Sequence, residues 1–128
     1  MTILRYVGNF DELGYDHHPD APSLADCRGK RSLEHKADVI RYLQSGKTYI
    51  FSPGLDRDFF DERRAADTRT LLTDGVYTWP RLLAYYVENY DVALPREFEV
   101  HMKANGWIIP DEINVKNLKL PAIPTHAT

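Results

Sequence analysis

The sequence has very little cysteine and no long apolar run, and both absences narrow what the protein can be. Cys27 is the only cysteine among 128 residues, so the chain cannot form an internal disulfide or a cysteine-rich zinc site. No apolar run approaches the ~18 residues that suggest a membrane-spanning helix. The N-terminus lacks the basic start and apolar run of a signal peptide. We therefore expect a cytoplasmic protein that does not enter a membrane.

Positive charge is also scarce. The chain has 16 lysines and arginines against 19 aspartates and glutamates, which gives a formal net charge of −3. Nucleic-acid-binding domains of this size usually carry a clear basic excess, so direct binding to DNA or RNA is disfavoured. A mildly acidic protein is instead suited to solubility or to a basic partner.

Recognised catalytic motifs are absent as well. No serine lies in a Gly-x-Ser-x-Gly elbow, and there is no phosphate-binding loop or dinucleotide fingerprint. Two candidates for chemistry remain. Cys27 has basic neighbours that favour a thiolate, and the loop Asp16-His17-His18 with Asp20 carries metal-binding groups. A structural thiol and a solvated loop are the simpler interpretations, so we expect no catalytic residue, no metal and no cofactor.

What the sequence does contain is a strong turn signal between two strand-like runs. Asp74-Gly75 separates residues 68–72 from residues 76–79, in which Tyr77 and Trp79 alternate with smaller side chains. The dipeptide predicts a type I′ hairpin turn with positive φ at both central residues. Pro80 has no N–H, so we expect it to end the strand and to begin a helix.

Hydrophobic spacing and chain-breaking residues predict the remaining elements. Residues 3–7 and 48–51 are strand-like, and helices are expected at residues 32–44, from residue 80 to 89 and from residue 95 to 104. Ser32 suits an N-cap, and Gly46 suits the position just after a helix. Residues 55–66 fit either a loop or one helical turn. We predict an α+β fold: a small antiparallel sheet with a central β-hairpin, covered by about three helices. A single globular domain is expected over residues 1–110, followed by a C-terminal tail, residues 111–128, that is weakly ordered unless bound.

Charged and aromatic residues gather in residues 56–64, around Phe59 and Phe60. A mixed run of this kind is usually a solvated face, but aromatic anchors inside a charged rim are also typical of protein interfaces. Residues 88–112 form the most acidic region, and Tyr85 and Tyr86 must point to different sides of one helix. The candidate partner-binding residues are Asp56, Asp58, Phe59, Phe60, Asp61, Glu62, Tyr85, Glu88, Asp91, Glu97 and Glu99.

Residues 22–109 resemble a family of small bacterial proteins. The resemblance lies in Thr73-Asp74-Gly75-Val76-Tyr77-Thr78-Trp79-Pro80, in Leu83-Ala84-Tyr85-Tyr86-Val87, in Leu94-Pro95-x-Glu97-Phe98 and in Ser52-Pro53-Gly54-Leu55-x-Arg57-Asp58. Members usually have Trp where Tyr77 stands. Several members resemble immunity proteins encoded beside polymorphic toxins, including deaminase toxins directed at nucleic acids. The resemblance implies no catalytic residues.

These observations favour a binding protein over an enzyme. We expect an immunity protein that neutralises a cognate toxin, itself a nucleic-acid-targeting and deaminase-like protein, by blocking its active site or substrate surface. Such a toxin needs a basic surface to hold phosphates, so we expect a basic partner in a one-to-one complex and no direct contact with nucleic acid. Two alternatives stay open: a small enzyme that uses Cys27 or the His17/His18 loop, and a regulatory subunit of a larger assembly.

Overall fold

The computed structural model describes residues 2–13, 21–32 and 34–121, and its centre is a four-stranded sheet. The strand order is β2 (Arg5–Tyr6), β7 (Tyr77–Pro80), β6 (Leu71–Thr73) and β3 (Lys47–Ile50), with β2 parallel to β7 and the other pairings antiparallel. Two smaller pairings join β1 (Thr2–Ile3) to β8 (Leu118–Lys119), and β4 (Leu55–Arg57) to β5 (Ala65–Thr68).

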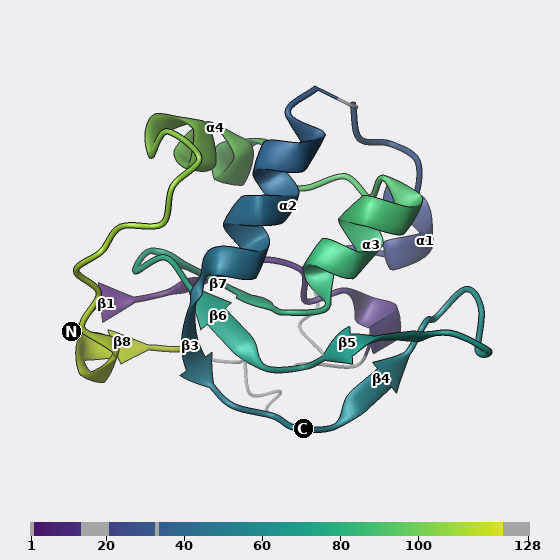
Figure 1. The fold of residues 1–128 in the computed structure, drawn as a ribbon, viewed down its shortest axis with the longest axis horizontal. Coiled ribbons are helices and arrows are strands. Elements are labelled where there is room, and N and C mark those ends of the chain that lie inside the picture. Colours follow the sequence, from purple (N-terminus) through teal and green to yellow (C-terminus); the bar gives the residue numbers. More distant parts are fainter. Residues whose placement is uncertain (1, 14–20, 33, 122–128) are drawn as a thin grey trace, which may run out of the picture.

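The helices complete an α+β fold, as predicted. Helices α2 (Lys36–Ser45) and α3 (Leu83–Tyr90) lie over the sheet, α4 (Arg96–Ala104) lies beyond α2, and the short α1 (Leu24–Cys27) lies next to α3 (Figure 1). The described chain also forms a 3₁₀ turn before α1, η1 (Asp11–Leu13), and another after α4, η2 (Val115–Asn117). Within the described residues, no helix combines the length and apolarity needed to cross a membrane.

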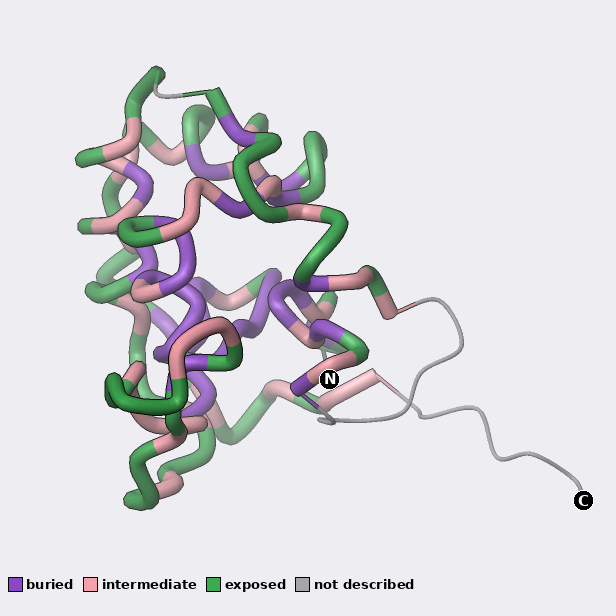
Figure 2. The backbone as a smooth tube through the Cα atoms, turned by 90° about the vertical axis from the view of Figure 1, so that its right-hand side faces the viewer, coloured by how far each residue is buried: buried purple, intermediate pink, exposed green. Residues whose placement is uncertain are grey.

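The core lies between the helices and the sheet, where buried residues gather in the interior of the molecule (Figure 2). Trp79 of β7 is fully buried and donates its indole N–H to the Leu43 carbonyl over 2.9 Å. Its ring centroid lies 5.9 Å from that of Tyr42 and 5.5 Å from that of Phe98. Aromatic side chains bury the largest apolar areas, so this cluster contributes strongly to holding α2 and α4 on the sheet.

The β6–β7 hairpin forms where the sequence predicts it, but its turn differs from the expected type. Gly75 has a φ of +95°, whereas Asp74 is not among the residues with positive φ. The Asp74 carboxylate instead accepts the backbone N–H groups of Val76 and Tyr77, over 2.9 and 2.7 Å. Expecting positive φ at both Asp74 and Gly75 was therefore wrong, because Asp74 stabilises the turn through its side chain. Pro80 is the last residue of β7, opposite Leu71, so it ends the strand as predicted, but α3 begins only at Leu83.

Helix α2 begins later than predicted, and Gly46 has a different role from the one expected. Ser32 accepts the N–H of Glu34 over 3.1 Å and so stabilises a turn before the helix, whose N-cap is His35. Gly46 has a φ of −56°, so it needs no left-handed conformation. A Cβ atom at Gly46 would lie 2.7 Å from Trp79 Cζ2 and 2.8 Å from Leu72 Cβ. Glycine is therefore required there because the end of α2 directly abuts the sheet.

Part of the C-terminal segment that follows residue 110 contacts the rest of the fold. Ile113 is buried, and its carbonyl accepts a hydrogen bond of 2.8 Å from the Lys47 ammonium group. The Leu118 carbonyl accepts the Tyr49 hydroxyl over 3.1 Å, and β8 pairs with β1. Residues 111–121 are thus fixed by contacts within the chain, and the remaining tail residues, 122–128, lie outside the described part.

Candidate protein-interaction surface

Residues 55–68 form a second hairpin, which the sequence left as a loop or helical turn. In the ladder Leu55 lies opposite Thr68, and Arg57 lies opposite Ala65. The Asp58 N–H donates to the Arg64 carbonyl over 2.9 Å, which closes the loop between β4 and β5. One oxygen of the Asp58 carboxylate accepts the N–H groups of Phe60 and Asp61, over 2.7 and 3.2 Å. This local bonding of an aspartate to the following backbone stabilises the turn.

The other carboxylate oxygen of Asp58 ties the hairpin to helix α3. It accepts hydrogen bonds from the hydroxyls of Tyr85 and Tyr90, with lengths of 2.6 and 2.5 Å. The Phe59 N–H donates to the hydroxyl of Tyr86 over 2.9 Å, which adds a third link to the same helix. Asp58 is only 1% exposed. We therefore conclude that Asp58, expected to be a partner-binding residue, acts from inside the protein by fixing the hairpin.

The electrostatics of this link favour a charged carboxylate and protonated hydroxyls. Burial alone would raise the pKa of Asp58, but hydrogen bonds from Tyr85, Tyr90 and two backbone N–H groups outweigh it and hold that pKa below its usual value. Burial and the hydrogen bond to Asp58 raise the pKa of Tyr85. The hydrogen bond to Asp58, followed by burial, raises that of Tyr90. The two tyrosine contacts are thus charge-assisted hydrogen bonds, which are stronger than neutral ones.

The two adjacent phenylalanines of the loop have different surroundings. The Phe60 ring packs against the core, with its centroid 4.7 Å from that of Tyr90. The Arg28 guanidinium lies 4.4 Å from the Phe60 centroid, a cation–π contact. Phe59 remains 46% exposed. Of the two aromatic anchors expected from the sequence, Phe59 is therefore the one that is available to a partner.

Among the charged residues of the hairpin, two aspartates form ion pairs within the protein, whereas Glu62 and the arginines are exposed. Asp56 pairs with Arg69 over 2.5 Å, and Asp61 accepts the guanidinium of Arg63 over 3.0 Å. Glu62 is exposed. Three arginines at positions 57, 63 and 64 are exposed. The carboxylates expected to form an acidic binding face are thus mostly engaged within the protein, and the solvent-facing charge of the hairpin is largely arginine.

Apolar side chains next to this hairpin are unusually exposed. Phe51 is 74% exposed, Leu55 is 68% exposed and Ile50 is 43% exposed. The connection that carries them is fixed, because the Thr70 hydroxyl both accepts the N–H of Ser52 over 3.0 Å and donates to its carbonyl over 2.9 Å. We term the set Ile50, Phe51, Leu55 and Phe59 the hairpin surface. Of this set only Phe59 was predicted from the sequence, whereas Ile50, Phe51 and Leu55 were not. The adjoining Ser-Pro-Gly turn was the available signal that the strand ends at the edge of the fold.

The remaining predicted residues fall into two groups. Glu88 is exposed on α3, one turn after Tyr85, and so lies near the hairpin. Asp91 pairs with Lys36 over 2.8 Å, and Glu99 pairs with the buried Arg31 over 2.6 Å. Helix α4, which carries Glu97 and Glu99, lies on the opposite side of the molecule from the β4–β5 hairpin (Figure 1). The structure thus brings residues 56–62 together with Tyr85, but it separates them from the acids of α4.

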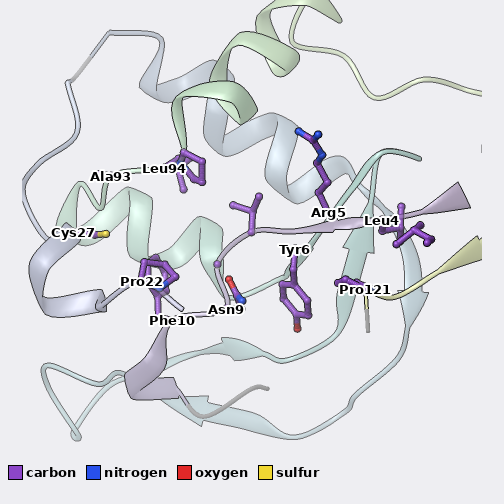
Figure 3. Close-up of a pocket in the computed structure, with 14 residues that line it drawn as sticks. Leu4, Arg5, Tyr6, Asn9, Phe10, Pro22, Cys27, Ala93, Leu94 and Pro121 are labelled. Atoms are coloured by element: carbon purple, nitrogen blue, oxygen red, sulfur yellow. The ribbon is translucent and has the colours of Figure 1, made fainter. Parts of the chain in front are cut away.

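A hollow of about 820 Å³ is the second feature that a ligand could use (Figure 3). Cys27, Ala93 and Leu94 lie at one end of it, and Leu4 and Pro121 lie at the other. Burial, together with the charges of Asp26 and Glu12, raises the pKa of the Cys27 thiol, which disfavours the reactive thiolate. No histidine is found among the described residues that line the hollow. The described surroundings of Cys27 therefore do not favour the thiolate that the nucleophilic alternative needs.

The metal-like loop of the sequence, with Asp16, His17, His18 and Asp20, lies outside the described residues. Within residues 2–13, 21–32 and 34–121, no group of three or more His, Cys, Asp or Glu side chains is placed to hold a metal ion.

Comparison with known proteins yields no match: no family model, no curated protein and no solved structure is similar to this chain.

Proposed function

We propose that the protein is a binding module and that the hairpin surface docks onto another protein. The observation that carries this proposal is the exposure of Phe51 and Leu55, at 74% and 68%. Single exposed apolar residues are ordinary, but a group of them next to a polar rim is typical of interaction sites. Ile50 and Phe59 extend the exposed apolar set along the same stretch of chain.

The way the hairpin is held supports this proposal. Asp58 binds the loop backbone and two tyrosines of α3, and Thr70 fixes the backbone of Ser52. A surface that is already ordered loses less conformational entropy when it binds. The hairpin is therefore suited to present its apolar side chains in a defined arrangement.

The partner that we propose is a cognate bacterial toxin, which the protein neutralises as an immunity protein by covering its active site or substrate surface. The resemblance over residues 22–109 supports this choice and extends it to nucleic-acid-targeting, deaminase-like toxins. We propose a one-to-one complex with such a toxin. A basic toxin would be attracted by the net charge of −3, to which the exposed Glu88 and Glu97 contribute. The hairpin would then supply the apolar anchors rather than the acidic contacts.

Co-expression with the product of the neighbouring gene tests the proposal. We expect a stable one-to-one complex in light scattering after gel filtration. Phe51→Ala should weaken it by ~2 kcal/mol, as for an interface anchor. Ile108→Ala is the matched control, because Ile108 is 69% exposed but follows α4 on the other side of the molecule. Failure to form a complex, or equal effects of the two variants, would refute the proposal.

A further inference from the structure

The charges beside the hairpin surface point to the chemistry of the partner. We infer that the partner presents an apolar cavity bordered by at least one carboxylate, so that Phe51 and Leu55 enter the cavity and Arg57 pairs with the carboxylate. This inference rests on the proposed function, because it concerns the partner of the same surface.

The position of Arg57 is the first reason. Leu55 and Arg57 are alternate residues of β4, and both are exposed while Asp56 between them is half-buried. Alternate residues of a strand share one face, so Leu55 and Arg57 lie on the same exposed face of β4. Arginine beside apolar anchors is a combination that interfaces favour, because its planar group pairs with a carboxylate through two parallel hydrogen bonds.

The lack of an internal counter-charge is the second reason. Within the described residues, Arg57 donates to the backbone carbonyl of Glu62 over 3.2 Å and has no ion pair with a carboxylate. The nearby aspartates are already engaged: Asp56 pairs with Arg69, and Asp58 is saturated by tyrosine hydroxyls and backbone N–H groups. A partner carboxylate would therefore supply a contact that the hairpin itself does not.

The same charges argue against a second copy of this chain as the occupant. Two copies that met through identical hairpin surfaces would bring Arg57 of each copy toward the same positively charged rim, which also carries the exposed Arg64. Two-fold contacts need a self-complementary surface, and like charges at an interface are unfavourable. Glu62 is the exposed acid of this rim, set against the exposed Arg57 and Arg64, whereas Arg63 is paired with Asp61.

Charge reversal at Arg57 tests the inference in the complex with the product of the neighbouring gene. We expect Arg57→Glu to raise the Kd at least ~30-fold, as for loss of one member of a desolvated charge pair. Arg57→Lys should have a smaller effect because lysine cannot make the two parallel hydrogen bonds. Arg96→Glu is the control: it makes the same change in charge at an exposed position of α4, on the other side of the molecule.

The outcomes distinguish failure of the proposed partner carboxylate from failure of the proposed binding function. Equal Kd values for Arg57→Glu and Arg96→Glu, with binding still weakened by Phe51→Ala, would overturn the partner carboxylate and leave the binding function intact. No complex with the parent protein would overturn both. A dimer of the isolated protein in sedimentation equilibrium, converted to a monomer by Phe51→Ala, would show that a second copy occupies the surface and would overturn the inference.

Discussion

Asp58 and Asp74 stabilise the β4–β5 and β6–β7 hairpins with the same bonding pattern. Each carboxylate accepts backbone N–H groups from the residues two and three positions later. Each also receives side-chain contacts from helices. The hydroxyls of Tyr85 and Tyr90 donate to Asp58, whereas for Asp74 the Tyr42 hydroxyl donates over 2.6 Å and His101 Nε2 lies at 3.0 Å.

The two sites differ in which parts of the fold they join. Both partners of Asp58 belong to α3, so this carboxylate connects one peripheral hairpin to one helix. Tyr42 belongs to α2 and His101 to α4, so Asp74 connects the central hairpin to two helices. Similar local chemistry therefore serves global stability at Asp74 and the geometry of the hairpin surface at Asp58.

Replacing Asp74 should have the largest effect. Asp74→Ala leaves two turn N–H groups and the Tyr42 hydroxyl without their acceptor in the interior, so we expect a loss of ~3–5 kcal/mol in the free energy of unfolding. Denaturant titration followed by circular dichroism measures it. A loss below ~1 kcal/mol would show that Asp74 does not join the core in this way.

Asp58→Ala should cost ~2 kcal/mol, and the loss should be local. Amide hydrogen exchange should accelerate in residues 58–64 more than in β6 and β7. The complex with the partner should dissociate faster because the hairpin surface is no longer held in place. Uniform acceleration of exchange across the molecule would mean that Asp58 and Asp74 have equivalent roles.

The turns themselves provide a finer comparison. Gly75→Val should destabilise the protein by ~1 kcal/mol or more, because a β-branched residue resists the φ of +95° that Gly75 adopts. The nearest atoms to a Cβ there belong to Ile113, at 3.7 and 3.9 Å, so the cost comes from the backbone rather than from a clash. Gly75→Ala tests the same strain with a smaller side chain. An unchanged melting temperature for both variants would contradict the turn geometry.

The smallest effect concerns acid. The folded pKa of Asp58 lies below the ordinary value, so its contribution to stability is complete above about pH 4, the unfolded pKa, and is lost as the pH falls through the folded pKa. Below about pH 4 the unfolding free energy of the parent should therefore decrease more steeply than that of Asp58→Asn. Parallel pH profiles would show that the tyrosine hydrogen bonds do not stabilise the charged carboxylate.

The central hairpin was predictable because its signals are local. Asp74-Gly75 and the alternation of Tyr77 and Trp79 lie within a few residues, and the α+β class followed from them. The β4–β5 hairpin was not predictable in the same way, because Asp58 finds its tyrosines 27 and 32 residues later in the sequence. The charged run at residues 56–64 also shows no alternation of apolar and polar residues that would predict two strands.

The candidate site shows the same limit. The exposure of Phe59 was expected from its charged neighbours, but the exposure of Phe51 could not be predicted from the sequence. Thr48, Tyr49, Ile50 and Phe51 have the same strand propensity in a central strand as in an edge strand, and the sheet order places β3 at the edge. The acids were misjudged for a related reason: Arg69 neutralises Asp56 only once the hairpin has formed.

The close approach at Gly46 also restricts how this sequence can change over time. A smaller residue in place of Trp79 would remove one of the two short contacts to a side chain at position 46, but the other is to the Cβ of Leu72. Every amino acid except glycine has that atom. Replacing Trp79 alone therefore does not make room for a side chain at position 46. A larger residue there also requires the end of α2 to lie farther from β6.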